Sequence, residues 1–375
     1  MNRHLARTFL IAACACLLLA GCQTKDEQIV EDAYASLVKL AASDTADGDN
    51  FAYAVGLDGE YAIIGAPAAE SALTDSGEAY LFRRSQGGLD GWGEIKVLVA
   101  DDAGANDFFG CSVSVSGDYA VVGAGGENGS GTDQGAAYVF YRNQGGADNW
   151  GQVKKIVGND TADDDGFGYS VAIDGTTILV GADGEDGSGA DQGAAYLFYK
   201  DQGGTDNWGQ VAKVTSGDPD DLNQFGYTLA LKGDYALVGS PREDGAGSDR
   251  GAAYLFSRNV GGADAWGVVK KIVPSDPTDG TWFATAVAID GTLAVVGAGW
   301  DDGGGTNRGA AYVFGRDIGG TDNWGQIKKL AASDAHDADM FGYSVAIDGT
   351  NVVVGAGWAA AGGTERGQGY VFAKD

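Results

Sequence analysis

A 58-residue repeat constrains this chain more than any other feature of its sequence. Each copy begins with a phenylalanine, and consecutive starts are 58 residues apart. A fixed period without drift predicts one supersecondary unit stacked six times, in which each unit buries its apolar faces against its neighbours. The six starts are Phe51, Phe109, Phe167, Phe225, Phe283 and Phe341.

The third copy indicates how one unit folds. Residues 167–173 alternate large and small side chains, which is the period of a strand. Asp174-Gly175 then suits a two-residue hairpin turn, because both residue types tolerate positive φ. Further β-rich segments cover residues 177–182, 193–199 and 208–214. We therefore expect four short antiparallel strands per copy.

Six such units predict an all-β chain folded as a six-bladed β-propeller with four-stranded antiparallel blades. The last copy ends after its third strand, whereas residues 38–44 resemble the fourth-strand segment 327–334. We therefore expect residues 37–42 to supply the outer strand of blade six and to close the ring, which would remove open sheet edges. An open β-solenoid is the alternative, although its repeats are usually shorter.

The first 21 residues have the features of a bacterial lipoprotein signal peptide. Arg3 and Arg7 precede an apolar segment, residues 9–20, that is too short to span a membrane as a stable helix. Leu19-Ala20-Gly21-Cys22 follows and resembles a lipobox, which predicts cleavage before Cys22 and lipidation of its thiol. An ordinary secretory signal with a chance cysteine is the alternative.

The predicted lipid anchor sets the expected location. Residues 22–36 would form the lipidated cysteine and a tether, and residues 37–375 the propeller. Three acyl chains would anchor the protein stably to a membrane. Gln23 favours the outer membrane in the enteric sorting pattern that this sequence resembles. We expect a monomeric propeller in the bacterial cell envelope, and its side of the membrane stays open.

The charge of the chain restricts its partners. Its net charge is −29, which argues against binding to nucleic acid and against electrostatic binding to anionic lipid. After signal cleavage only Cys22 and Cys111 are left, so lipidation of Cys22 would exclude an intramolecular disulfide. We expect Cys111 to be a small buried residue.

The copies resemble FG-GAP repeats of integrin α-subunit propellers, and more closely their short bacterial relatives. Phe167-Gly168, Val180-Gly181-Ala182 and Tyr196-Leu197-Phe198 carry the resemblance, which covers about residues 37–375. It implies a β-propeller with a role in adhesion or protein binding. Integrin propellers have seven blades, whereas six copies are counted here. Their calcium loop is replaced by a bare Asp-Gly or Gly-Asp step, so that calcium site is not carried over.

The loops between fourth and first strands carry 18 Asp and no Lys or Arg. In antiparallel blades they share a face with the loops between second and third strands, which predicts a negative face that attracts cations or a basic partner. A solvated surface that keeps the protein soluble is the alternative. Ca²⁺ is the cofactor that such loops would suit, because it takes six to eight oxygen ligands. The candidate ligands are Asp160, Asp163, Asp165, Asp183, Glu185, Asp186 and Asp191.

The tryptophans form two groups. Five recur at the start of the fourth strand, which indicates a structural role at the blade edge: Trp92, Trp150, Trp208, Trp266 and Trp324. Three others break the repeat on the acidic face, where exposed rings would stack on a sugar or anchor a protein. Local packing against neighbouring glycines is the alternative. The candidate ligand-binding residues are Trp282, Trp300, Asp301, Asp302, Arg308, His336, Trp358 and Arg366.

These features favour a lipid-anchored binding module that holds a protein or glycan partner on its acidic face. A passive envelope protein without a dedicated ligand is one alternative. A hydrolase that uses an Asp pair is another, but His336 is the only histidine after the signal, and the mature chain lacks the H-E-x-x-H, G-x-S-x-G and C-x-x-C motifs. We therefore assign no catalytic residue and expect no enzymatic activity.

Overall fold

The computed structural model describes most of the chain, and every regular element in the described part is a β-strand. No helix in that part is long and apolar enough to cross a membrane. The described residues are 38–70, 73–86, 91–129, 131–187, 189–217, 222–359 and 367–373.

The chain divides into two compact units. The smaller unit comprises residues 1–41 with 84–93, and its described residues include only the end of one strand and the start of the next. The larger unit comprises residues 42–83 with 94–375 and holds the remaining strands. The contacts described below lie within the larger unit.

Each repeat forms one antiparallel sheet, or blade, whose first two strands form a hairpin. The first strands are β1 (Ala54–Asp58), β5 (Ser112–Ser116), β9 (Ser170–Asp174), β13 (Thr228–Lys232), β17 (Ala286–Asp290) and β21 (Phe341–Asp348). The second strands are β2 (Tyr61–Ala66), β6 (Tyr119–Ala124), β10 (Thr177–Ala182), β14 (Tyr235–Ser240), β18 (Leu293–Ala298) and β22 (Asn351–Ala356).

The third and fourth strands lie progressively further from the first strand. The third strands are β3 (Glu78–Arg84), β7 (Ala136–Tyr141), β11 (Ala194–Tyr199), β15 (Ala252–Ser257), β19 (Ala310–Gly315) and β23 (Gln368–Ala373). The fourth strands are β4 (Trp92–Leu98), β8 (Gly151–Ile156), β12 (Gly209–Val214), β16 (Gly267–Ile272) and β20 (Gly325–Leu330).

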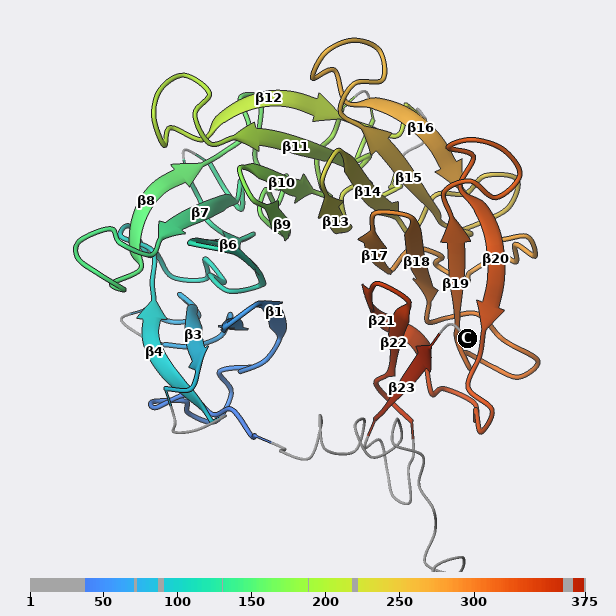
Figure 1. The fold of residues 1–375 in the computed structure, drawn as a ribbon, viewed down its shortest axis with the longest axis horizontal. Helices are drawn as coiled ribbons and strands as arrows, with labels where there is room; N and C mark the ends of the chain where they lie inside the picture. Colours follow the sequence, from blue (N-terminus) through green and yellow to red (C-terminus); the bar gives the residue numbers. More distant parts are fainter. Residues whose placement is uncertain are drawn as a thin grey trace, which may run out of the picture. The chain divides into compact units, whose positions relative to one another are not determined.

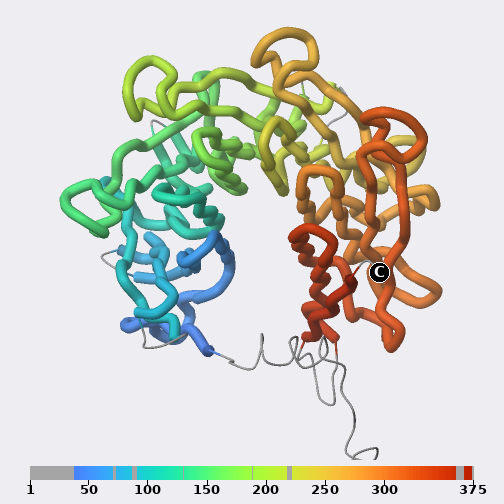
Figure 2. Tube along the Cα trace, in the orientation of Figure 1, coloured from blue at the N-terminus to red at the C-terminus, as the bar shows by residue number. Residues whose placement is uncertain are grey.

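The blades follow one another in chain order, with the first strands innermost and the fourth strands outermost (Figure 1). Each first strand packs beside the first strand of the next blade, from β1 and β5 to β17 and β21, and the chain trace follows the same succession (Figure 2). This arrangement confirms the predicted six-bladed β-propeller built from 58-residue units.

The repeated phenylalanine explains why the units must stack. Phe109 is fully buried, and its ring contacts Tyr138 and Phe140 edge-on, with ring centroids 5.5 and 6.0 Å apart. The same trio recurs in the other blades. Each hydrophobic cluster also draws residues from two neighbouring blades, so a blade cannot bury its apolar surface alone.

The Phe-Gly step positions each blade against the one before it. Gly168 has a φ of 93°, and a Cβ added there would lie 2.1 Å from the carbonyl oxygen of Ala136 in the preceding blade. Only glycine fits such a backbone approach. For this reason β9 begins at Ser170 and not at Phe167 as predicted, since Phe167 makes only an isolated bridge with Gly135.

The predicted hairpin is shifted by one residue. Asp174 pairs with Thr177 in the ladder, so the two loop residues are Gly175 and Thr176. Gly175 takes the first loop position with a φ of 59°, where a side chain would be strained. The equivalent glycine has a φ between 55° and 59° in all six blades.

Blade six differs from the prediction. Its sheet has three strands among the described residues, and residues 38–42, predicted to add a fourth, form no strand. Residue 37 lies outside the described part, so the predicted closing strand is not found among the described residues.

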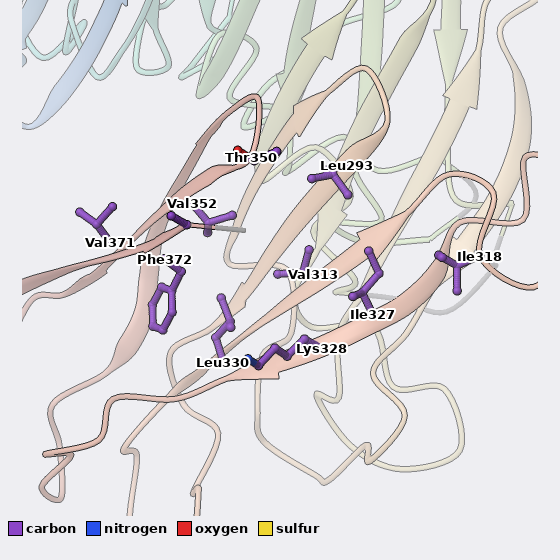
Figure 3. Close-up of a pocket in the computed structure, with 11 residues that line it drawn as sticks. Leu293, Val313, Ile318, Ile327, Lys328, Leu330, Thr350, Val352, Val371 and Phe372 are labelled. Carbon is purple, nitrogen blue, oxygen red and sulfur yellow. The ribbon is translucent and has the colours of Figure 1, made fainter. Parts of the chain in front are cut away.

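An apolar groove of about 610 Å³ lies between blades five and six (Figure 3). Leu293 of blade five faces Val352 and Phe372 of blade six across it. Between blades four and five, Trp324 fills the corresponding place by packing on Tyr235, the equivalent of Leu293. The groove therefore follows from the absence of a described fourth strand in blade six.

Candidate functional site

The tryptophans that open the fourth strands are structural, as predicted. Trp150, Trp208, Trp266 and Trp324 are at most 1% exposed. Three of them contact a tyrosine of the preceding blade edge-on, at centroid distances of 5.1 to 5.5 Å. The fourth, Trp266, donates a 2.9 Å hydrogen bond from Nε1 to the hydroxyl of Tyr199. We call these four residues the rim tryptophans.

The three irregular tryptophans join into one row with a tyrosine. The centroids of Trp282 and Trp300 lie 4.8 Å apart, and those of Trp300 and Tyr343 lie 5.9 Å apart. Tyr343 then meets Trp358 edge-on at 4.7 Å. Trp282, Trp300, Tyr343 and Trp358 form the aromatic ladder, which extends over blades five and six.

The ladder is unevenly exposed. Trp282 and Trp300 are half-buried, because each ring is covered by its neighbours along the row. Tyr343 and Trp358 are 43% and 38% exposed. Trp282 and Trp300 therefore support the row, while Tyr343 and Trp358 present most of its accessible surface. The predicted site omitted Tyr343.

Arg242 extends the ladder at its other end. Its guanidinium carbon lies 4.9 Å from the centre of the Trp282 ring, within the range of a cation–π contact. Its Nε is buried without a hydrogen-bond partner among the described residues. By contrast, Arg308, a predicted ligand-binding residue, pairs with Asp337 at 2.8 Å. Among the described residues, Arg242 is thus a guanidinium on the ladder without an acidic partner, and the sequence analysis did not select it.

The remaining predicted residues do not gather around the ladder as a set. Asp301 is 4% exposed and accepts hydrogen bonds from Tyr312 and Lys329, so it is structural. Asp302 is exposed and accepts from the backbone N–H of Asn307 at 3.1 Å. The His336 side chain is 80% exposed, and its backbone N–H donates to Asp339. Arg366 and the lipidation residue Cys22 lie outside the described residues.

A buried polar network recurs under the acidic loops. Lys155 pairs with Asp102 and Glu127 at 2.7 and 2.9 Å, and its ammonium lies 5.6 Å from the centre of the Tyr138 ring. Lys213 and Lys329 make two carboxylate contacts each, at 2.7 to 2.9 Å, and Lys271 contacts Glu243. Burial and the neighbouring carboxylates raise the pKa of Tyr138, so the phenol stays protonated.

This network accounts for several of the predicted calcium ligands. Lys213 pairs with both Asp160 and Glu185. Burial raises the pKa of Asp160, but the hydrogen bond and the charge of Lys213 lower it, and the net shift is downward. Asp165 accepts from the backbone N–H of Ala162 at 2.6 Å, and Asp186 accepts from that of Asp191. No group of three or more Asp, Glu, His or Cys in the described part of the chain is arranged to hold a metal ion. The two candidate clusters are thus not assembled into a metal site.

Two of these aspartates have shifted pKa values. Burial raises the pKa of Asp165 to about 6, and the charges of Glu185 and Asp186 add to the effect. Burial also raises the pKa of Asp183 to about 6, with a contribution from Asp191. The ionised form of each side chain is therefore less stable in the folded protein than in water.

Cys111 and the tyrosines equivalent to it occupy one position of the repeat. The rings of Tyr169 and Tyr227 lie 5.3 Å apart, and Tyr53 and Tyr343 occupy the same position in blades one and six. Cys111 as a residue is half-buried, its sulfur lies 3.6 Å from the carbonyl oxygen of Gly168, and burial raises the pKa of its thiol. Cys111 is thus a packing residue with a weak hydrogen bond, close to the expectation.

A comparison with protein-family models identifies the family of the chain. Its sequence matches the FG-GAP repeat six times, which covers most of its length, and no curated protein matches it. The first match begins at Tyr34, the position that corresponds to tryptophan in the other five. The matched segments are residues 34–82, 92–140, 150–198, 208–256, 266–314 and 324–372. Together with the six blades, these matches establish that the chain belongs to the FG-GAP repeat family.

Proposed function

We propose that this propeller is a non-catalytic binding module that holds a protein or glycan partner on its acidic loop face. The observation that carries the proposal is the exposed end of the aromatic ladder, Tyr343 with Trp358. Trp358 and its equivalent Trp300 interrupt the repeat, because no other pair of neighbouring blades carries tryptophan at both second-strand exits. Loops held by a rigid scaffold are common sites of binding function.

The chemistry of the ladder supports this use. Aromatic side chains combine a large apolar area with few rotatable bonds, so binding orders them at low entropic cost. Trp, Tyr and Arg are the residues most enriched in binding hot spots. Trp300 contacts the ring of Tyr343 directly, and Trp282 and Arg242 continue the row behind Trp300. A partner would therefore meet a preorganised surface.

The anchor forms the second part of the proposal. The signal and lipobox residues up to Cys22 would place the propeller in the cell envelope, on a tether that ends near residue 36. Metabolic labelling with an alkyne fatty acid tests it directly. We expect label on the natural chain and none on Cys22→Ser, and equal labelling of the two would contradict the anchor.

Binding is tested with an array of oligosaccharides and peptides, probed with the labelled propeller. Tyr343→Ser and Tyr53→Ser form a matched pair, because both tyrosines occupy the same repeat position and both are exposed. We expect Tyr343→Ser to lose the strongest interaction by at least ~10-fold and Tyr53→Ser to retain it. No interaction on the array, or equal loss in both variants, would contradict the proposal.

A further inference from the structure

Blade one contains a polar pocket of about 570 Å³ that is separate from the aromatic ladder. Six carboxylate residues line it, together with the small residues Ala46, Gly48, Ala68 and Ala69. No Lys or Arg pairs with any of these six acids in the described part of the chain. The six are Asp44, Asp47, Asp49, Glu70, Asp75 and Glu78.

The other blades show what normally occupies this place. In blades two to five, a lysine of the fourth strand reaches under the acidic loops and contacts one or two carboxylates. Its ammonium also lies 5.1 to 5.6 Å from the centre of a buried tyrosine ring of the third strand. The repeat thus builds a receptor for an ammonium group and fills it from its own chain.

Blade one keeps part of the receptor and lacks the lysine. Val97 stands 58 residues before Lys155 and replaces it, while Asp44 is the equivalent of Asp102 and is retained. Tyr80 is the equivalent tyrosine and is fully buried. The loop acid Glu127 has no acidic equivalent in blade one, where Ala69 occupies its position. A different acid, Glu78, lies on the third strand and accepts a hydrogen bond from the Tyr80 hydroxyl. Blade one therefore keeps the tyrosine and one receptor carboxylate, gains a second carboxylate from another position, and lacks the internal cation.

Glu78 is the most deeply buried acid of the pocket and has no cationic partner among the described residues. Its side chain is in the pocket wall and only 6% exposed. Oε2 accepts from Tyr80, and Oε1 accepts from no donor among the described residues. Burial raises its pKa, and the charges of Asp44 and Asp49 raise it further, whereas the Tyr80 hydrogen bond lowers it. A buried carboxylate without a cationic partner is costly, and a bound cation would relieve that cost.

We propose that the blade-one pocket binds a primary alkylammonium group, which takes the place of the lysine that the other blades provide internally. The chemistry favours an ammonium group over a metal ion, because the equivalent sites hold an N–H donor between carboxylates and beside a tyrosine ring. No described group of acids here has the arrangement of a metal site. The group would come from a free diamine or from a lysine of a partner protein.

The test uses 1,5-diaminopentane and acetyl-lysine-methylamide as probes, at constant ionic strength and pH 7.5. Melting temperature and titration calorimetry are the two measurements. Tetramethylammonium is the control, because it has the charge without N–H donors, and Ca²⁺ is a separate arm. We expect both amines to raise the melting temperature by roughly 1–3 °C, and tetramethylammonium to leave it unchanged. The amine that binds more tightly indicates which source the pocket suits.

Two variants keep the proposal falsifiable. Val97→Lys would restore the internal cation, so it should raise the melting temperature without ligand and abolish the response to both amines, whereas Val97→Met should do neither. Glu78→Gln keeps the shape of the wall and should weaken amine binding by ~10-fold or more. A response to Ca²⁺ but not to amines, equal responses to amines and tetramethylammonium, or an unchanged amine response in Val97→Lys would overturn it.

Discussion

The rim tryptophans and the tryptophans of the aromatic ladder occupy opposite environments in one protein. The rim residues recur every 58 positions and are at most 1% exposed, each between two blades. The ladder residues occur in two blades only, contact one another, and end in an exposed ring. Where the repeat keeps a large residue, that residue holds blades together, and where it departs from the pattern, the surface is available to a partner.

The lysines extend the same contrast. Lys155, Lys213, Lys271 and Lys329 recur in the buried networks of four blades, whereas blade one has Val97 and an open acidic pocket. Loss of a repeated residue is thus as informative as gain of an irregular one. One departure, Trp358, follows a second strand, and the other, Val97, lies in the fourth strand β4.

The largest effect is expected at the rim. Trp208→Ala should lower the free energy of unfolding by ~3–5 kcal/mol, because it removes a fully buried indole and leaves a cavity between two blades. Urea unfolding followed by circular dichroism measures the change. A loss below ~1 kcal/mol would show that the rim residue does not hold the blades together.

A smaller loss is expected in the buried network. Lys213→Val places the blade-one residue of this position in blade three and leaves Glu185, which is 7% exposed, without its cation. We expect a loss of ~1–3 kcal/mol at pH 7.5 that shrinks as the pH falls, because protonated carboxyls no longer need the partner. Stability equal to that of the natural chain at every pH would contradict the comparison between blades one and three.

The ionisation of Asp183 should make stability depend on pH in the opposite direction. Its folded pKa of about 6 lies above that of the unfolded chain, so between these values the folded state binds more protons and stability falls as the pH rises. Asp183→Asn should therefore raise the melting temperature by roughly 1–3 °C at pH 8 and have no effect near pH 3.5. Asp101→Asn, at an exposed position, is the control. If Asp183→Asn changed the melting temperature equally at every pH, the raised pKa of Asp183 would not be the cause.

The smallest change in stability is expected at the ladder's exposed end. Trp358→Ala should alter the free energy of unfolding by no more than ~0.5–1 kcal/mol, because its ring is 38% exposed and contacts Tyr343 only at its edge. The same urea experiment gives the value. A loss as large as that of Trp208→Ala would make Trp358 a structural residue.

The repeat period made most of the fold predictable. Phe109 and its equivalents identified the blades, and the rim tryptophans were correctly separated from the irregular ones. The start of β9 was misplaced because alternation does not reveal the close backbone contact of Gly168 with the preceding blade. Pairing of residues 37–42 with blade six was predicted from their similarity to residues 327–334 alone, and the described residues 38–42 form no strand.

The site was predictable only in part. Trp358 stood out because it breaks the repeat, whereas Tyr343 was hidden because tyrosine is common at its position. Arg242 was missed because its role depends on having no acid beside it, which needs coordinates. The acidic pocket had a readable signal, the replacement of lysine by Val97, but its meaning required the lysine contacts in the other blades.

The affinity of Trp358→Ala for the strongest array ligand, measured beside its melting temperature, tests most directly whether binding resides where the repeat is broken. We predict at least ~10-fold weaker binding than the natural chain shows, with the melting temperature changed by no more than roughly 2 °C. Unchanged affinity in this stably folded variant would contradict the assignment of the aromatic ladder as the binding surface.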